Sequence, residues 1–139
     1  MARALRTARP ELAVIDWDDF MPAVEALTGR DVRGARELWA PYRELVRSVV
    51  VALGAVPTVV FGVCTPDELL DWPDAEWIVL DCEGDERRRR LSDRPVEEAN
   101  DAVADAFEYR RLGLRVLNTS GRTVEDVVRE LALLLEART

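Results

Sequence analysis

Short apolar runs alternate along this chain with longer segments in which apolar residues recur every three to four positions. We predict strands in the four apolar runs, at residues 12–15, 58–63, 77–80 and 114–117. We predict helices at residues 2–9, 20–32, 34–53, 66–72, 85–91, 96–112 and 123–137. This alternation is typical of a parallel sheet whose strands are connected through helices.

Local end signals support several of these elements. Thr65 and Glu68 have the spacing of a capping box, with Pro66 at the first helical position between them. Thr123 and Asp126 repeat the capping-box spacing before the last helix. The sequence therefore predicts one α/β domain over residues 1–139, a three-layer parallel sheet with helices on both faces.

Composition narrows the partners of such a domain. The chain has 139 residues, with 19 basic and 27 acidic side chains and a net charge of −8. A binder of duplex DNA or of an anionic membrane normally carries a basic face, so we expect neither a nucleic-acid nor a membrane partner. No apolar run approaches the ~20 residues that span a bilayer, and the N-terminus lacks a secretory signal. We expect a cytoplasmic protein.

The chain contains neither histidine nor lysine, and these two absences exclude several chemistries. The chain contains no histidine, which rules out Ser-His and Cys-His catalytic pairs, and we predict no metal-ligating cluster. The two cysteines, Cys64 and Cys82, are predicted to be buried, reduced thiols. All the basic residues are arginines, so neither a Schiff-base lysine nor the lysine of a Walker A phosphate-binding loop is present.

A run of carboxylates follows the first predicted strand. Asp16, Asp18 and Asp19 surround Trp17 where that strand ends, and ligands of open α/β sheets bind at the carboxyl ends of strands. A carboxylate here could orient a substrate hydroxyl, accept its proton or hold a metal-bound water. Asp18 or Asp19 could instead cap the following helix, and for Asp19 we favour the cap.

Two further polar segments follow the third and fourth predicted strands. Residues 87–90 are four successive arginines, which splay around a helix so that only one or two can face a ligand. The others are expected to be solvated or paired with Glu83, Asp85 and Glu86. The second segment, residues 117–123, is a strand-to-helix turn of small polar residues, which recurs in many α/β folds.

In their order and spacing, these segments resemble the P-loop small-molecule kinases, the group that includes shikimate, gluconate, chloramphenicol and nucleoside-monophosphate kinases. The similarity covers the whole chain and is closest to small bacterial ATP-binding proteins of that group. The matching motifs are Asp16-Trp17-Asp18, Val79-Leu80-Asp81-Cys82, Arg90-Leu91-Ser92-Asp93-Arg94, Tyr109-Arg110-Arg111-Leu112-Gly113 and Asn118-Thr119-Ser120.

The resemblance implies roles for individual residues. Asp16, or less favourably Asp18, would lie beside the acceptor hydroxyl and the magnesium shell. Arg90 and Arg94 would reach the phosphates from a lid at about residues 84–97. The turn residues Asn118, Thr119 and Ser120 would border the adenine. The implied cofactors are ATP and Mg²⁺, and the implied partner is a small hydroxylated molecule or a nucleotide; a homo-oligomer is left open.

One departure from the family pattern affects function directly. The family begins with a strand, a G-x-x-x-x-G-K-[ST] loop and a helix, whereas this sequence begins within what resembles that helix. We therefore expect a truncated kinase whose chain neither binds ATP nor transfers phosphate by itself. The alternative is a non-catalytic binding or regulatory domain derived from a kinase.

The same departure bears on the sheet. In the family, the missing strand lies between those matching residues 58–63 and 77–80. We predict that, without it, these two strands pair directly in one four-stranded sheet, or that a strand of another chain fills the gap.

Overall fold

The computed structural model describes residues 1–136. The chain divides into two compact units, Met1–Pro73 and Asp74–Thr139, which are described separately. No helix among the described residues is both long enough and apolar enough to cross a membrane.

The first unit contains one two-stranded sheet and its connecting helices. Its elements are α1 (Ala2–Ala8), β1 (Ala13–Asp16), η1 (Trp17–Phe20), α2 (Met21–Thr28), η2 (Arg36–Leu38), α3 (Trp39–Leu53), β2 (Thr58–Phe61) and η3 (Pro66–Leu69), where η denotes a 3₁₀ helix. Gly29 and Gly54, with φ of 68° and 59°, adopt the backbone conformation that ends α2 and α3.

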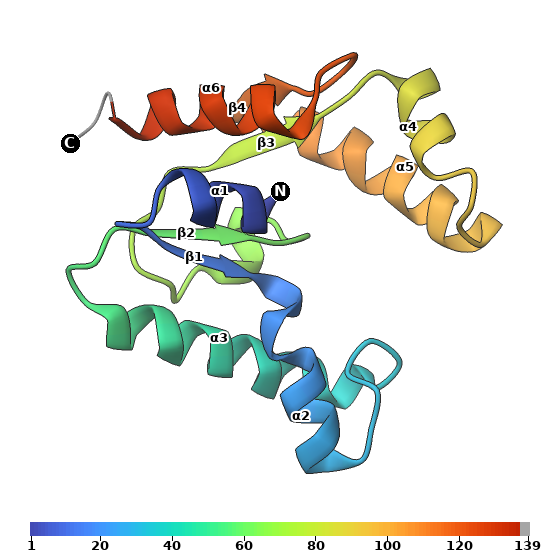
Figure 1. The fold of residues 1–139 in the computed structure, drawn as a ribbon. Helices are drawn as coiled ribbons and strands as arrows, with labels where there is room; N and C mark the ends of the chain where they lie inside the picture. Colours follow the sequence, from blue (N-terminus) through green and yellow to red (C-terminus); the bar gives the residue numbers. More distant parts are fainter. Residues whose placement is uncertain (137–139) are drawn as a thin grey trace. The chain divides into compact units, whose positions relative to one another are not determined.

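Strands β1 and β2 are parallel, in a register that runs from Ala13 opposite Thr58 to Asp16 opposite Phe61. Figure 1 shows α1 and α3 on opposite faces of this sheet. The core beneath it joins Ile15 of β1 to Tyr42 and Val46 of α3, and all three side chains are buried. The apolar face of α3 therefore fixes the end of β1, where the acidic run begins.

The two edges of this sheet differ. The Ala13 N–H donates to the Pro57 carbonyl, so alternate residues of each strand face outward. On the outer edge of β1, Arg6 Nε donates to the Val14 carbonyl at 2.8 Å and the Asp16 N–H donates to Asp19 Oδ2 at 2.7 Å. On β2 the outward backbone groups of Thr58 and Val60 have no hydrogen-bond partner within residues 1–136. Side chains therefore cover part of the outer edge of β1, whereas among the described residues the outer edge of β2 stays open.

The second unit repeats the arrangement of two parallel strands and connecting helices. Its elements are β3 (Ile78–Asp81), α4 (Gly84–Arg90), α5 (Val96–Arg111), β4 (Arg115–Asn118) and α6 (Val124–Glu136). The register runs from Ile78 opposite Arg115 to Asp81 opposite Asn118. The buried side chains of α6 are Val127, Val128 and Leu131, spaced to form one helical face.

The expected three-layer, four-stranded sheet is wrong. The described residues form two separate two-stranded sheets, and β2 does not pair with β3. The connections explain the difference. Helices lie between β1 and β2 and between β3 and β4, and a parallel crossover usually returns over the sheet through such a helix. Between β2 and β3, the helix expected at residues 66–72 is only the 3₁₀ turn η3. The predicted direct pairing of β2 with β3 is also wrong, because each pairs with a different strand.

Candidate functional site

In the second unit, polar side chains gather where β3 and β4 end. Thr119 continues the ladder beyond β4, because its N–H and its hydroxyl both donate to the Asp81 carbonyl, at 2.7 and 2.9 Å. Thr119 is the one polar residue that is buried among those described. This is the carboxyl edge of a parallel pair, the position at which α/β proteins bind ligands.

Arg90, at the last position of α4, is anchored to this edge. Its guanidinium donates to the Thr119 carbonyl at 2.8 Å and to the Thr119 hydroxyl at 3.1 Å. It also donates to Glu86 Oε1 at 2.5 Å, one helical turn earlier. The structure thus brings the predicted lid residue Arg90 next to the predicted turn, but the Arg90 guanidinium is already paired with the Glu86 carboxylate.

Glu86 links α4 to the turn after β4. Its Oε2 accepts a hydrogen bond from the Gly121 N–H at 2.9 Å, while Oε1 accepts from Arg90. The hydrogen bond from Gly121, followed by the pairing with Arg90, lowers the pKa of Glu86 against the opposing effect of burial. Glu86 is therefore a carboxylate held between a backbone donor and an arginine.

Asp81, the last residue of β3, is held by two arginines. Arg110 Nε donates to its Oδ2 at 2.6 Å and Arg87 forms an ion pair with Oδ1, and the Asp81 side chain is only 12% exposed. Both arginines also donate to the Cys82 carbonyl, at 2.9 and 3.0 Å. Burial alone would raise the pKa of Asp81, but the Arg110 and Cys82 hydrogen bonds and both arginine charges lower it.

Asn118 and Ser120, the other two turn residues predicted for the site, form hydrogen bonds within the turn and to the loop before α4. Asn118 Oδ1 accepts from the Ser120 N–H at 2.9 Å, and Ser120 Oγ accepts from the Glu83 N–H at 2.7 Å. These bonds fix the loop before α4 to the turn before α6. The predicted turn residues therefore lie at a structural junction, and their role of bordering the adenine stays a prediction.

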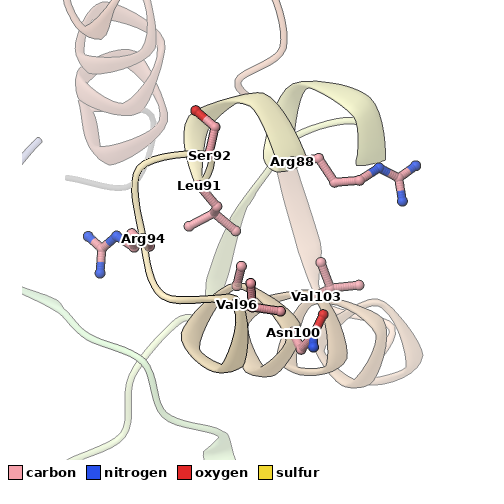
Figure 2. A pocket seen from close by; sticks show the side chains of 8 residues that line it. Arg88, Leu91, Ser92, Arg94, Val96, Asn100 and Val103 are labelled. Atoms are coloured by element: carbon pink, nitrogen blue, oxygen red, sulfur yellow. The ribbon is translucent and has the colours of Figure 1, made fainter.

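Arg94 lies away from that junction, on the loop between α4 and α5. It forms an ion pair with Glu98 at 3.6 Å. It also lines an open pocket of about 290 Å³, together with Arg88, Leu91, Ser92, Val96, Ala99, Asn100 and Val103. Figure 2 shows Leu91 facing Val96 there, with the guanidinium groups of Arg88 and Arg94 directed away. The two predicted lid arginines thus have different surroundings.

In the first unit, Asp16 is the N-cap of η1. It accepts from the Asp18 N–H at 3.2 Å, and Asp19 reciprocates from the third position of η1 by accepting from the Asp16 N–H. Asp18 and Asp19 form ion pairs with Arg33 and Arg6. Asp16 has no ion pair among the described residues. The cap we assigned to Asp18 or Asp19 is centred on Asp16, and Asp19 completes the box.

Three aromatic side chains surround the start of this acidic turn. The indoles of Trp17 and Trp72 are stacked, with ring centroids 5.8 Å apart and an interplanar angle of 24°. Tyr42 meets Trp17 edge-on at 5.9 Å and donates its hydroxyl hydrogen to the Trp17 carbonyl. Burial, followed by the charges of the nearby aspartates, raises the pKa of Tyr42. The acidic turn is therefore held by packing among these three aromatic side chains and by the hydrogen bond from Tyr42.

The candidate residues are divided between the units. Arg90 and the turn residues 118–120 form one network in the second unit, whereas Asp16 and Asp18 lie in the first.

From the sequence we assigned no ligand role to Glu86, Gly121, Asp81 or Arg110. The four-residue spacing from Glu86 to Arg90 was the available signal, and we read it only as surface pairing. Within residues 1–136, no three cysteine, aspartate or glutamate side chains are grouped to hold a metal ion.

Comparison with known proteins adds no assignment to this geometry. The chain matches no family model, no curated protein and no solved structure.

Proposed function

We propose that this chain carries the nucleotide-side turn and the acceptor-side acid of an ATP-dependent small-molecule or nucleotide kinase, and that it does not transfer phosphate by itself. The observation that carries the proposal is the bond between Arg90 and Thr119 at the carboxyl edge of the β3–β4 pair. It places an arginine fork, the preferred partner of phosphate oxygens, where parallel sheets bind ligands.

The resemblance supplies the remaining roles in this proposal. Asn118, Thr119 and Ser120 border the adenine, Arg90 and Arg94 meet the phosphates, and Asp16 or Asp18 serves the acceptor hydroxyl and the Mg²⁺ shell. The absence of lysine explains why the chain alone is inactive. Phosphoryl transfer depends on positioning and charge stabilisation, and a chain without the loop lysine and its cradle of backbone amides lacks both around the terminal phosphates.

A nuclear magnetic resonance titration tests the nucleotide-side assignment. Adenosine phosphates at millimolar concentration should shift the backbone amides of residues 118–121 in the labelled full chain. Arg90→Ala should abolish these shifts, whereas Arg88→Ala should preserve them, because Arg88 is exposed and pairs with Asp85. Shifts confined to other residues, or shifts that survive Arg90→Ala, would contradict the assignment.

A gain-of-function experiment tests the kinase activity. A strand and a G-x-x-x-x-G-K-T loop joined before Met1 should confer measurable transfer from labelled ATP. In that fusion, Asp16→Asn should lower turnover by about a hundredfold, as expected for a residue at the reacting hydroxyl. Asp19→Asn should lower turnover much less than Asp16→Asn. Arg94→Ala should lower turnover more than Arg88→Ala. Equal losses at Asp16 and Asp19 would show that the acid is misplaced.

A second function, a non-catalytic binding or regulatory domain, is favoured by a different observation. The arginines at the β3–β4 edge already face carboxylates, since Arg90 pairs with Glu86 while Arg87 and Arg110 pair with Asp81. Such neutralised arginines suit a domain that has kept the fold and lost ATP. A fusion that folds, shows no shifts at residues 118–121 with adenosine phosphates and transfers no phosphate would favour this second function.

A further inference from the structure

We propose that Glu86 occupies an anion site of this protein, and that a phosphate group binds there by displacing the Glu86 carboxylate from Arg90 and Gly121. The inference deepens the proposed function and rests on it in one respect, because both assign Arg90 to an anionic ligand. It adds the position of the phosphate, its backbone donor and an internal competitor for the site.

Glu86 is held by donors of the kind that bind a phosphate group. Its two oxygens are held separately, Oε1 by Arg90 at 2.5 Å and Oε2 by the Gly121 N–H at 2.9 Å. Arg89 approaches Oε1 as well, at 3.4 Å. Two arginines and a backbone N–H that converge on one carboxylate are the donors that proteins use for phosphate oxygens.

The shape of this site does not depend on Glu86. Arg90 has two bonds to Thr119, which is itself bonded to the Asp81 carbonyl. Gly121 has a φ of 63°, in the left-handed region, so the turn that presents its N–H is set by the glycine backbone. If the carboxylate moves away, the guanidinium and the N–H stay in place.

The Glu86 carboxylate can leave this site. Its backbone lies in the short helix α4, and its side chain is 17% exposed, so a rotation of the side chain brings the carboxylate to water. A phosphate group carries more negative charge than a carboxylate and has an additional oxygen for Arg89. The exchange replaces one anion by another and leaves the arginines paired.

The neighbouring residue provides a matched control. Asp85 lies in the same helix turn and carries the same charge. Within residues 1–136 it pairs only with Arg88, and its side chain is 97% exposed. Glu86→Gln and Asp85→Asn therefore make the same change in net charge, one inside the proposed site and one outside it. A general electrostatic effect on anion binding would appear equally in both variants.

The experiment measures binding of inorganic phosphate to the full chain by phosphorus NMR or calorimetry at low ionic strength. Glu86→Gln should bind phosphate at least about tenfold more tightly than the unaltered chain, the effect of removing a like charge a few ångströms from the ligand. Asp85→Asn should bind as the unaltered chain does. Adding Arg90→Ala to Glu86→Gln should remove the gain.

Two outcomes would overturn the proposal. An equal gain in both single variants would show a net-charge effect, and no gain in Glu86→Gln would show that no anion site lies beneath the carboxylate. If Glu86→Gln fails to fold by circular dichroism, Glu86→Ala serves instead, because alanine suits an interior helix position. The probe has no adenine, so a gain of phosphate binding without nucleotide shifts at residues 118–121 would sustain this inference and refute the nucleotide-side assignment.

Discussion

Asp81 is a largely buried carboxylate in the second unit, and its charge should matter for stability. Two arginines donate to its carboxylate, which is largely buried, so removal of the charge would leave both guanidinium groups without a counterion. We predict that Asp81→Asn lowers the free energy of unfolding by about 2 kcal/mol. Asp85→Asn, at a fully exposed carboxylate, should leave it unchanged. Urea denaturation followed by circular dichroism measures both, and equal effects would contradict the prediction.

The same residue should make stability depend on pH. The arginines hold the pKa of Asp81 below its ordinary value in the folded chain, and unfolding returns it to that value. The stabilisation is therefore fully present above the unfolded pKa and is lost as the pH falls through the folded pKa. Acid unfolding should be less steep in Asp81→Asn than in the unaltered chain, and parallel curves would exclude a role for this carboxylate.

Cys64 is predicted to be an unreactive thiol. Burial, with a smaller contribution from the charge of Glu68, raises the pKa of Cys64 to about 11. At pH 8, roughly one thiol in a thousand would be the reactive thiolate, so alkylation by iodoacetamide should be far slower than for free cysteine. Mass spectrometry of the labelled Cys64 peptide measures this rate, with guanidinium-unfolded chain as the control. Equal rates in both would show that the thiol is exposed.

Some residue roles could not be predicted because they depend on where a strand ends. The sequence placed the end of the first strand at Ile15, which made Asp16 a free carboxylate and Asp18 or Asp19 the cap. The strand continues to Asp16, and that one-residue extension turns Asp16 into the N-cap of η1. Hydrophobic patterning identifies strands well but does not resolve their last residue.

At the scale of elements, local patterns predicted most of what formed. Each of the four strands lies within a residue or two of its apolar run, and both capping boxes are present, at Thr65 with Glu68 and at Thr123 with Asp126. These features depend on neighbours in sequence. The pairing of strands depends on the connection between them. Between β2 and β3 we predicted a helix at residues 66–72, and only the 3₁₀ turn η3 formed there.

The open edge of β2 gives a prediction for hydrogen exchange. The N–H groups of Val59 and Phe61 face β1, whereas those of Thr58 and Val60 face outward without partners. Amide exchange should therefore alternate along β2, slow at Val59 and Phe61 and fast at Val60. Asp16 in β1 should be slow although it faces outward, because Asp19 accepts its N–H. Equal protection at Val59 and Val60 would mean that something covers this edge in solution.

At the scale of the whole molecule, the absence of lysine leads to a prediction about activity. The full chain should show no detectable ATP hydrolysis or phosphate transfer, since no lysine can meet the terminal phosphates. Calorimetry with Mg-ATP should show no saturable binding at micromolar concentration. Saturable binding in that range would refute this expectation, and transfer by the unaltered chain would require a different catalytic group.

The whole fold was the least predictable level. The sequence contains the strands and helices of a layered α/β domain, and from their alternation we expected one continuous sheet. Two separate parallel pairs formed instead, each joined by its own helical crossover. The alternation of apolar runs and helical segments indicates which strands and helices form. The extent of a sheet depends instead on backbone pairing between residues distant in sequence. The candidate residues followed the same division, with Asp16 in one unit and Arg90 in the other.

The stacked indoles of Trp17 and Trp72 make the first unit separately visible by spectroscopy. Two chromophores held 5.8 Å apart couple their electronic transitions, which produces paired circular-dichroism bands of opposite sign. Both rings belong to Met1–Pro73, so this optical couplet follows the folding of that unit alone. Trp17→Phe should abolish it. During heating or titration, loss of the couplet ahead of the helical signal would show one half of the chain unfolding while the other persists.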